Sequence, residues 1–274
     1  MGTNLAILGG GNIGMAIAGG LVRKGGWPAE RIRISRRDTT ARTAIAALGF
    51  QACSSTAEAL EGAALVLLCV QPAQCPELLD ELAPLLQPTQ TLVSVVTGLS
   101  VAAIKARVGE RPVVRAMPNT AITLGESMTC LAADAPDRDS VEPVRTLFDS
   151  LGSTRVIKEE LMGQATALCA CGVAFFLRAI RAASQGGIEI GFHADEAIAM
   201  AAQTARGAAS LLLVPGAHPE SEIDRVTTPM GCTIAGLNLM EHEGFSSAMI
   251  KGIVGSSRKA DNLSAASKGE TRTD

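Results

Sequence analysis

Tyrosine is absent from this 274-residue sequence, and aromatic residues make up 3% of it. The chain is nevertheless 47% hydrophobic. Much of that apolar content is alanine, a small residue that favours helices, so we expect closely packed helices. A chain of this length suits one large or two ordinary domains and has ample core.

Excess positive charge is also lacking, because the formal net charge is −3. A nucleic-acid partner needs a basic face, so we expect none. No N-terminal segment combines a basic region with a cleavage site. The apolar stretch 162–177 is too short and too rich in small residues for a membrane span. We therefore expect a cytoplasmic protein without a membrane partner.

Paired cysteine spacing is the third absence. The seven cysteines are an odd number without paired C-x-x-C spacing. Since no secretory signal is present, we interpret them as reduced thiols that behave mostly as small buried hydrophobic residues. The three histidines show no metal-ligand spacing, so we expect no metal site.

The stretch 4–21, NLAILGGGNIGMAIAGGL, is the most informative part of the first half. A short apolar run typical of a buried parallel strand leads into G-x-G-x-x-G and then a helical pattern. Gly9 would allow a tight turn, Gly11 a close approach to a pyrophosphate, and Gly14 close packing of helix on strand. The alternative is a glycine-rich turn without a ligand. We predict a dinucleotide site that contains Gly9, Gly11, Asn12, Ile13 and Gly14.

The next predicted strand, 31–35, ends in residues that select the cofactor. An acidic residue here would bind the ribose 2′-hydroxyl of NAD, whereas arginine suits the 2′-phosphate of NADP. The chain has Ser35 and Arg36, which favour a phosphate through charge-assisted hydrogen bonds. The alternative is a solvated basic turn in which Asp38 caps the next helix. We predict NADPH as cofactor, with NADH as the second choice.

Apolar runs alternate with helical patterns as far as residue 158. This alternation predicts an α/β fold, an N-terminal Rossmann domain with a doubly wound parallel sheet. Ligands of such sheets lie beyond the carboxyl ends of the strands. Further strands are predicted at 63–70, 91–96, 112–117, 127–131 and 154–158, with helices at 56–62, 73–86, 100–108 and 140–151. The strand ends place Val70, Gln71, Pro72, Thr97 and Asn119 at the ligand edge.

Beyond residue 159 the predicted elements are all helical. Alanine-rich patterns with few charges bury poorly alone, so we expect a C-terminal all-α domain that completes its core against a second subunit. A monomeric helical cap is the alternative. The predicted helices are 160–185, 194–214, 220–226 and 233–259. The predicted domains are 1–158 (dinucleotide-binding) and 159–262 (helical, for substrate and dimerisation), followed by a disordered tail, 263–274.

A second candidate site lies in 226–233, VTTPMGCT. Proline and glycine break the chain before an apolar-periodic run, which places Thr233 at or near a helix N-terminus. Free backbone N–H groups and the hydroxyls of Thr228 and Thr233 would form a small anion site suited to a carboxylate. The alternative is that one of these threonines merely caps its helix.

At this point the chain resembles the Δ1-pyrroline-5-carboxylate reductases over about residues 4–262. The motifs that carry the resemblance are GGGNIGMAIAGGL, RAMPNTA (115–121), QTARGAASLLL (203–213), HPESEIDRVTTPMGCTIAGL (218–237) and MEHEGF (240–245). The resemblance implies a Rossmann domain, a helical domain that interlocks two subunits, and rings of dimers in many members. It also implies NAD(P)H-dependent reduction of a cyclic imino acid to L-proline.

By the same resemblance, the N–H groups of Gly231, Cys232 and Thr233 should bind the substrate carboxylate. The Thr233 hydroxyl should hydrogen-bond the ring nitrogen, which makes Thr233 the candidate catalytic residue. Thr228 and Asn119 complete the candidate substrate-binding set.

The chain departs from the family pattern at several positions. Gln71 replaces a usual lysine, Met230 replaces a glycine, and Cys232 replaces a threonine. The segment 163–175 loses an acid, two serines, a glycine and a proline. These changes leave open a related imine as substrate, such as pyrroline-2-carboxylate or a piperideine-carboxylate.

Two alternative functions share this two-domain plan. A β-hydroxyacid dehydrogenase needs a lysine general acid on a helix of the second domain, and 160–210 contains no lysine. A non-catalytic NADP-binding homologue is the other alternative, and intact Gly231 and Thr233 count against it.

Overall fold

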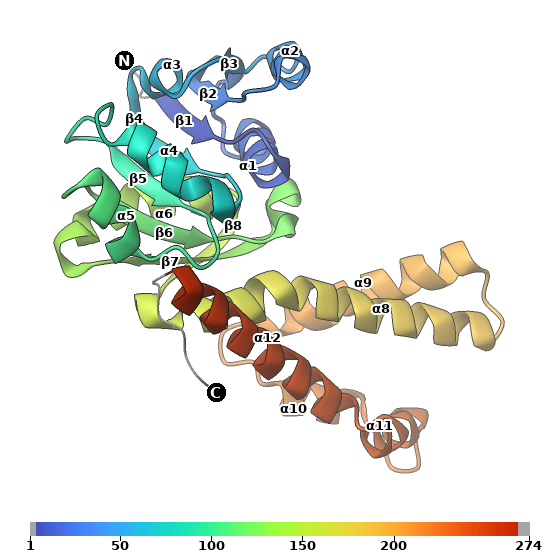
Figure 1. The fold of residues 1–274 in the computed structure, drawn as a ribbon. Helices are drawn as coiled ribbons and strands as arrows, with labels where there is room; N and C mark the ends of the chain where they lie inside the picture. The colour runs from blue at the N-terminus through green and yellow to red at the C-terminus, as the bar shows by residue number, and fades with distance from the viewer. Residues whose placement is uncertain (1–3, 268–274) are drawn as a thin grey trace. The chain divides into compact units, whose positions relative to one another are not determined.

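The computed structural model describes residues 4–267. Its strands are β1 (Asn4–Leu8), β2 (Ile32–Ser35), β3 (Gln51–Cys53), β4 (Ala63–Leu68), β5 (Thr91–Ser94), β6 (Val113–Met117), β7 (Ser127–Ala133) and β8 (Gly152–Val156). Within the described residues they form one 8-stranded sheet in the order β3-β2-β1-β4-β5-β6-β7-β8 (Figure 1). The order β3-β2-β1-β4-β5-β6 is that of a Rossmann domain, which confirms the predicted fold class.

Strands β1 to β6 are mutually parallel, whereas β7 is antiparallel to β6. The reason is the connection 118–126, which is too short for a parallel crossover. Strand β8 pairs in parallel with β7. Strand β3 was not predicted, because three residues with one side chain buried give no readable periodicity.

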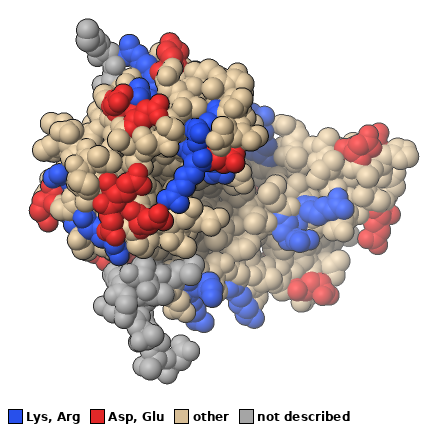
Figure 2. Space-filling model, turned by 45° about the horizontal axis from the view of Figure 1, so that its top comes forward, with Lys and Arg blue, Asp and Glu red and all other residues tan. Residues whose placement is uncertain are grey.

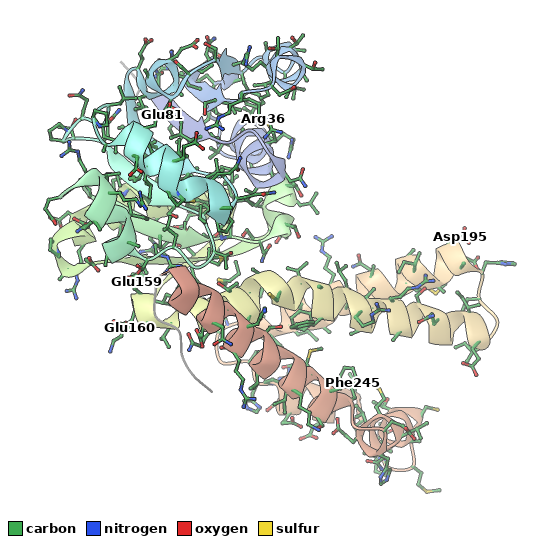
Figure 3. The ribbon with its side chains drawn as sticks, viewed as in Figure 1. Arg36, Glu81, Glu159, Glu160, Asp195 and Phe245 are labelled. Atoms are coloured by element: carbon green, nitrogen blue, oxygen red, sulfur yellow. The ribbon has the colours of Figure 1, made fainter. Side chains whose placement is uncertain are left out.

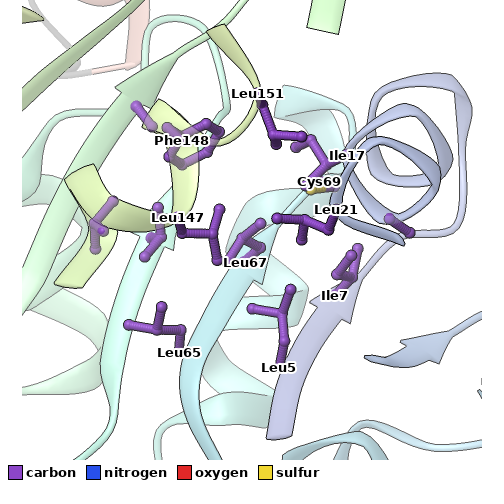
Figure 4. Packing of buried hydrophobic residues seen from close by; sticks show 14 of the residues in the cluster. Leu5, Ile7, Ile17, Leu21, Leu65, Leu67, Cys69, Leu147, Phe148 and Leu151 are labelled. Atoms are coloured by element: carbon purple, nitrogen blue, oxygen red, sulfur yellow. The ribbon is translucent and has the colours of Figure 1, made fainter. Parts of the chain in front are cut away.

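Helices cover both faces of the sheet. They are α1 (Asn12–Arg23), α2 (Thr39–Ala47), α3 (Thr56–Leu60), α4 (Cys75–Leu82), α5 (Val101–Val108) and α6 (Val141–Asp149), with short 3₁₀ turns that include η2 (Pro72–Gln74), η3 (Thr120–Leu124) and η5 (Glu159–Leu161). Alternate residues of β1 enter two separate cores. Leu5 and Ile7 pack with α1 and α6 (Figure 4), and Ala6 and Leu8 pack with α3, α4 and α5. Burial of both faces explains why the strands read as continuous apolar runs.

The remaining helices are α7 (Met162–Ala165), a π-helical stretch (Thr166–Cys171, the π-segment), α8 (Gly172–Glu189), α9 (Ala194–Leu212), α10 (Pro219–Val226), α11 (Cys232–His242) and α12 (Phe245–Ser267). The predicted single helix 233–259 is wrong: Gly244, with φ at +79°, separates α11 from α12. The predicted disordered tail also begins too early, because α12 continues to Ser267. The rest of that tail, 268–274, lies outside the described residues.

The chain divides into two compact units, 1–171 with 256–274 (the sheet unit) and 172–255 (the helical unit). In the helical unit α8 and α9 lie side by side and pack through small residues. A Cβ built on Gly187 would lie 3.1 Å from Cβ of Ala197, so the two helices approach closely. The sheet unit includes residues 159–171. The predicted division into domains 1–158 and 159–262 stays a prediction.

Large apolar side chains are exposed along the helical unit. Phe176 is 60% exposed, Ile190 78% and Leu213 83%. By contrast, the buried residues of α8 and α9 are the small Gly172, Ser184 and Ala197, and α10 and α11, which the structure describes throughout, bury none. A monomer of this unit therefore leaves an apolar surface uncovered.

Candidate active site

Steric crowding explains why two positions of the loop after β1, Gly9 and Gly14, are glycine. Gly9 has a φ of +110°, and a Cβ on it would lie 2.5 Å from the carbonyl oxygen of Cys69. A Cβ on Gly14 would collide with the carbonyl oxygen of Gly9. Neither position has room for a side chain. Glycine at both positions therefore allows β1, the loop and α1 to pack closely, as the G-x-G-x-x-G pattern predicts.

Helix α1 begins directly after this loop. Gly11 is its N-cap and contributes no side-chain hydrogen bond. The first turn reads NIGM, so no carboxylate competes for its N–H groups. Asn12 is exposed and Ile13 packs against the core. First-turn N–H groups have no acceptor within the helix, and with the helix dipole they form an anion site.

Ser35 and Arg36 adjoin the same loop. The Ser35 carbonyl accepts hydrogen bonds from the backbone N–H groups of Gly9 (3.4 Å) and Gly10 (3.3 Å). A Cβ on Gly11 would lie 4.0 Å from Nη1 of Arg36, and Figure 3 places Arg36 beside α1. The Arg36 guanidinium therefore lies next to the anion site formed by α1.

The capping alternative for Asp38 is also realised. Its carboxylate accepts a 2.6 Å hydrogen bond from the backbone N–H of Ala41, at the start of α2. This cap does not involve Arg36, so the two interpretations are compatible.

The edge after β4 completes the cofactor candidates. Cγ1 of Val70 would lie 3.0 Å from a Cβ on Gly9, so Val70 borders the loop. Gln71 and Pro72 follow and are exposed. The Cys69 thiol beside them is fully buried, and burial raises its pKa to about 12. Cys69 therefore stays protonated at neutral pH.

Asn119 is predicted to contact substrate. Both polar atoms of its side-chain amide form hydrogen bonds within the protein. Oδ1 accepts from the N–H of Ala121 (2.9 Å), and Nδ2 donates to the Cys169 carbonyl in the π-segment (3.0 Å). The Asn119 side chain thus connects the end of β6 to η3 and to the π-segment. Its contact with substrate stays a prediction.

The loop before α11 is a tight turn. The Gly231 N–H donates to the Thr228 carbonyl at 2.9 Å, Pro229 and Met230 lie between them, and Met230 has a φ of +59°. Proline followed by a left-handed residue is typical of a type II turn, where glycine is the usual residue at the second position. The turn engages the Gly231 N–H in a hydrogen bond within the protein. Binding of a substrate carboxylate by this group stays a prediction.

The first turn of α11 follows this turn and provides further candidate groups for binding substrate. Its N-cap is Gly231, without a side-chain cap, and Cys232 and Thr233 form its first turn with exposed side chains. Neither Thr228 nor Thr233 is the N-cap, so the alternative that one of them merely caps this helix is wrong. The structure brings Thr228, Cys232 and Thr233 together at the start of α11 in the helical unit. The cofactor candidates lie together in the sheet unit.

Two features of the sheet unit were missed. Glu159 accepts hydrogen bonds from the Val101 N–H (2.8 Å) and from Arg115 (3.1 Å), which is 5% exposed. Burial lowers the pKa of Arg115, and Glu159 partly offsets that effect. The second is the contact of Cys130 with Cys169. Partners 39 or 44 residues apart in sequence carry no local signal.

Charge and metal ligands give no further site. Basic and acidic side chains are interspersed on the face shown in Figure 2. Among residues 4–267, no group of three or more His, Cys, Asp or Glu side chains is placed to hold a metal ion.

Comparison with known proteins identifies the family. Residues 159–263 match the family described as pyrroline-5-carboxylate reductase dimerisation, and residues 4–98 match that described as NADP oxidoreductase, coenzyme F420-dependent. "Pyrroline-5-carboxylate reductase 2" of Dictyostelium discoideum is 46% identical over 96% of this chain and 94% of its own length. This chain belongs to the pyrroline-5-carboxylate reductase family.

A second family member from Dictyostelium discoideum, "Pyrroline-5-carboxylate reductase 1", is 48% identical over 94% of this chain. The chain spans about half of that protein, 49% of its length. A solved pyrroline-5-carboxylate reductase from Coxiella burnetii has a TM-score of 0.87 at 25% identity and covers 96% of this chain and 98% of its own. A Plasmodium falciparum pyrroline carboxylate reductase solved with NADP bound has a TM-score of 0.85 at 22% identity, over 96% and 98% of the two chains, which shows a shared fold.

The family match also explains the exposed apolar helices. Within residues 4–267 one helical stretch, 159–189, is long and apolar enough to cross a membrane by length and composition, and 22% of its most apolar window is buried. That stretch lies inside the matched dimerisation region, 159–263. Homo-oligomerisation through the C-terminal helices therefore accounts for its apolar surface.

Proposed function

We propose that this chain reduces Δ1-pyrroline-5-carboxylate to L-proline with NADPH. It is an NAD(P)H-dependent oxidoreductase that acts on a C=N bond. The observation that carries the proposal is the 46% identity to a family member over nearly the full length of both chains. The glycine loop with Arg36 beside it supports NADPH as the cofactor.

The sheet unit supplies the cofactor site. The N–H groups of the first α1 turn would hold the pyrophosphate, with Gly9, Gly11, Asn12, Ile13 and Gly14 as the binding residues. Ser35 fixes the loop through its carbonyl, and the Arg36 guanidinium would bind the 2′-phosphate. Val70, Gln71 and Pro72 would border the nucleotide at the edge after β4. NADPH supplies the hydride when bound.

The helical unit supplies the substrate site. The N–H groups of Cys232 and Thr233 would bind the substrate carboxylate at the positive end of α11. The Thr233 hydroxyl would hydrogen-bond the ring nitrogen and fix the orientation of the imine carbon toward the cofactor. Thr228 and Gly231 would shape the turn that presents these groups. Asn119 is the remaining proposed substrate contact.

A second substrate is favoured by the position of Met230. Its side chain is fully exposed at the tip of the substrate turn, where the family pattern has glycine. A long flexible thioether at this place would reshape the pocket. Pyrroline-2-carboxylate and the piperideine-carboxylates are the candidates.

The proposed assembly is a homodimer joined by the C-terminal helices, extended in a ring of dimers. We place the enzyme in the cytoplasm, since its apolar helical surface is assigned to the dimer. The partners are then a second copy of the chain and a small cyclic imino acid.

The first test is NADPH oxidation with DL-pyrroline-5-carboxylate, with pyrroline-2-carboxylate and the piperideine-carboxylates at matched concentrations. Turnover of the first with the highest kcat/KM supports the proposal. Turnover of another imine alone assigns the enzyme to that substrate. Tight NADPH binding without turnover of any imine contradicts the proposed reaction and identifies a non-catalytic homologue.

Two variants separate the roles of the two sites. Thr233→Ala should lower kcat by about 100-fold, because a positioned proton donor contributes at least that much, and should leave the Kd of NADPH unchanged. Arg36→Ala is its comparator and should raise the KM of NADPH about tenfold while that of NADH changes little, because it loses a charge-assisted hydrogen bond. Equal loss of imine reduction and NADPH affinity in Thr233→Ala would make Thr233 a structural residue.

A further inference from the structure

The Cys130 and Cys169 thiols form a pair between β7 and the π-segment. Cys130, on β7, is 5% exposed, and Cys169 is a partly buried residue of the π-segment. Their Sγ atoms lie 3.9 Å apart. The surrounding side chains are apolar and include Met117 and Met162. Proximity and an apolar environment set this pair apart, since no other two thiols among residues 4–267 are in hydrogen-bond contact with each other.

The distance suits bond formation after a small movement. A disulfide has an S–S length of about 2.05 Å, so the two sulfur atoms must approach by roughly 2 Å. Cys169 lies in a π-helical stretch, a rare helical form that is frequent at functional sites.

The two thiols also differ in reactivity. The hydrogen bond from the Cys130 thiol lowers the pKa of Cys169 to about 7, and the same bond raises the pKa of Cys130. Cys169 is therefore the thiolate and Cys130 the resolving thiol. Buried Cys75 behaves in the opposite way, since desolvation raises its pKa to about 11.

We propose that peroxide oxidises Cys130 and Cys169 to a reversible disulfide that switches the reductase off. The inference rests on the proposed function for its effect on activity, but disulfide formation itself does not depend on it. Its basis is the 3.9 Å Sγ–Sγ distance and the position of Cys169 in the π-segment.

The chemistry balances with hydrogen peroxide as oxidant. The Cys169 thiolate attacks one peroxide oxygen, an S–O bond forms, the O–O bond breaks, and the hydroxide that leaves takes up a proton. The Cys130 sulfur then attacks the Cys169 sulfenic acid, the S–S bond forms, and the S–O bond breaks. The second hydroxide leaves as water with the Cys130 proton. Two thiols lose two electrons in total, and one peroxide becomes two waters.

A chain of contacts connects the pair to the cofactor side of the sheet. The Cys169 carbonyl accepts from Asn119, whose Oδ1 holds the first turn of η3. The carbonyl of Thr123 in η3 in turn accepts a 2.7 Å hydrogen bond from Arg23 of α1. A shift of the π-segment is therefore transmitted to the helix that binds the pyrophosphate.

The experiment treats the full-length protein with hydrogen peroxide and then with dithiothreitol, and measures non-reducing peptide maps and NADPH oxidation. We expect a Cys130–Cys169 linked peptide and a kcat about tenfold lower, since a displacement of about 1 Å costs that or more. Dithiothreitol should restore kcat. Disulfide formation should accelerate between pH 6 and 8 as the Cys169 thiolate population rises through its pKa of about 7.

Cys171→Ser is the matched control, since Cys171 belongs to the same π-segment and should leave both the linked peptide and the loss of activity intact. Cys169→Ser and Cys130→Ser should abolish both, and Cys169→Ala checks that the result does not depend on serine. Absence of the linked peptide overturns the inference. Equal loss of activity in Cys169→Ser also overturns it and assigns the loss to another thiol, such as exposed Cys232.

Failure of the proposed function would look different. If the reduced protein reduces no imine, the linked peptide and the Kd of NADPH before and after oxidation decide the inference. A linked peptide together with a higher Kd for NADPH after oxidation supports the inference. An unchanged Kd contradicts the proposed switch.

Discussion

The sheet unit and the helical unit both contain large apolar side chains, but the sheet unit buries them and the helical unit exposes them. Among the residues whose burial the structure describes, the largest fully buried side chains lie in the sheet unit and include Phe148, Leu5 and Ile17. In the helical unit the large apolar residues Phe176 and Leu213 are exposed. Small residues fill the contact between α8 and α9 instead. Alanine-rich helices approach each other closely but bury little area per residue.

The difference teaches where stability comes from. The sheet unit buries apolar surface on both faces within one chain, so its stability does not depend on protein concentration. The helical unit completes its burial with a second chain, so its stability depends on protomer concentration. Substitutions in the helical unit should therefore change the dimer dissociation constant, and substitutions in the sheet unit should change the free energy of unfolding.

The largest expected effect is on assembly. Phe176→Glu, in α8, places a charge on the apolar face of the helical unit, and we expect the dimer dissociation constant to rise at least about 30-fold, the effect of losing an interface hot spot. Analytical ultracentrifugation over a concentration series measures it. Leu48→Glu is the matched control, because Leu48 is 62% exposed but lies in the sheet unit. A dimer constant that changes equally in both variants would contradict the comparison.

A smaller effect is expected on the sheet unit alone. Gly14→Val should lower the free energy of unfolding by about 1–3 kcal/mol and weaken NADPH binding, because its Cβ would collide with the carbonyl oxygen of Gly9. Gly19→Ala in the same helix is the control. Its Cβ would meet the flexible end of Arg23, which can move aside, so stability should hold or improve. Thermal unfolding and NADPH titration test both variants. Equal destabilisation of the two would show that the protein relieves the collision at position 14.

The smallest effect concerns the substrate turn. Met230→Gly should change the free energy of unfolding by less than about 0.5 kcal/mol, because relief of a left-handed methionine offsets the larger entropy of unfolded glycine. The KM of the imine should change while that of NADPH does not. Met200→Gly, within helix α9, should cost about 1 kcal/mol. A similar loss in both variants would mean that the turn does not require a left-handed residue.

Much of the fold could be predicted because its signals are local. The apolar run 63–70 contains β4, and the glycine pattern marks the loop before α1. The break at Gly244 was missed because MEHEGF lies inside a run with helical periodicity, and a single glycine at a helix end resembles one within a helix. The π-segment was missed because its apolar pattern fits an α-helix equally well.

The candidate site was predictable to the extent that it uses consecutive residues. Thr228 to Thr233 form one turn and one helix start, so their grouping follows from sequence. The engagement of the Gly231 N–H within the turn depends on the φ of Met230, which the sequence does not state. The links of Asn119 to Cys169 and of Arg115 to Glu159 depend on tertiary packing, so they required the structure.

The hydrogen bonds that the Ser35 carbonyl accepts from Gly9 and Gly10 have one more consequence. They fix the backbone of the glycine loop against the end of β2. The loop is thus preorganised, and the entropy cost of ordering it belongs to folding and not to binding. We therefore expect NADPH association without a slow conformational step at this loop, with a bimolecular rate that rises linearly with nucleotide concentration.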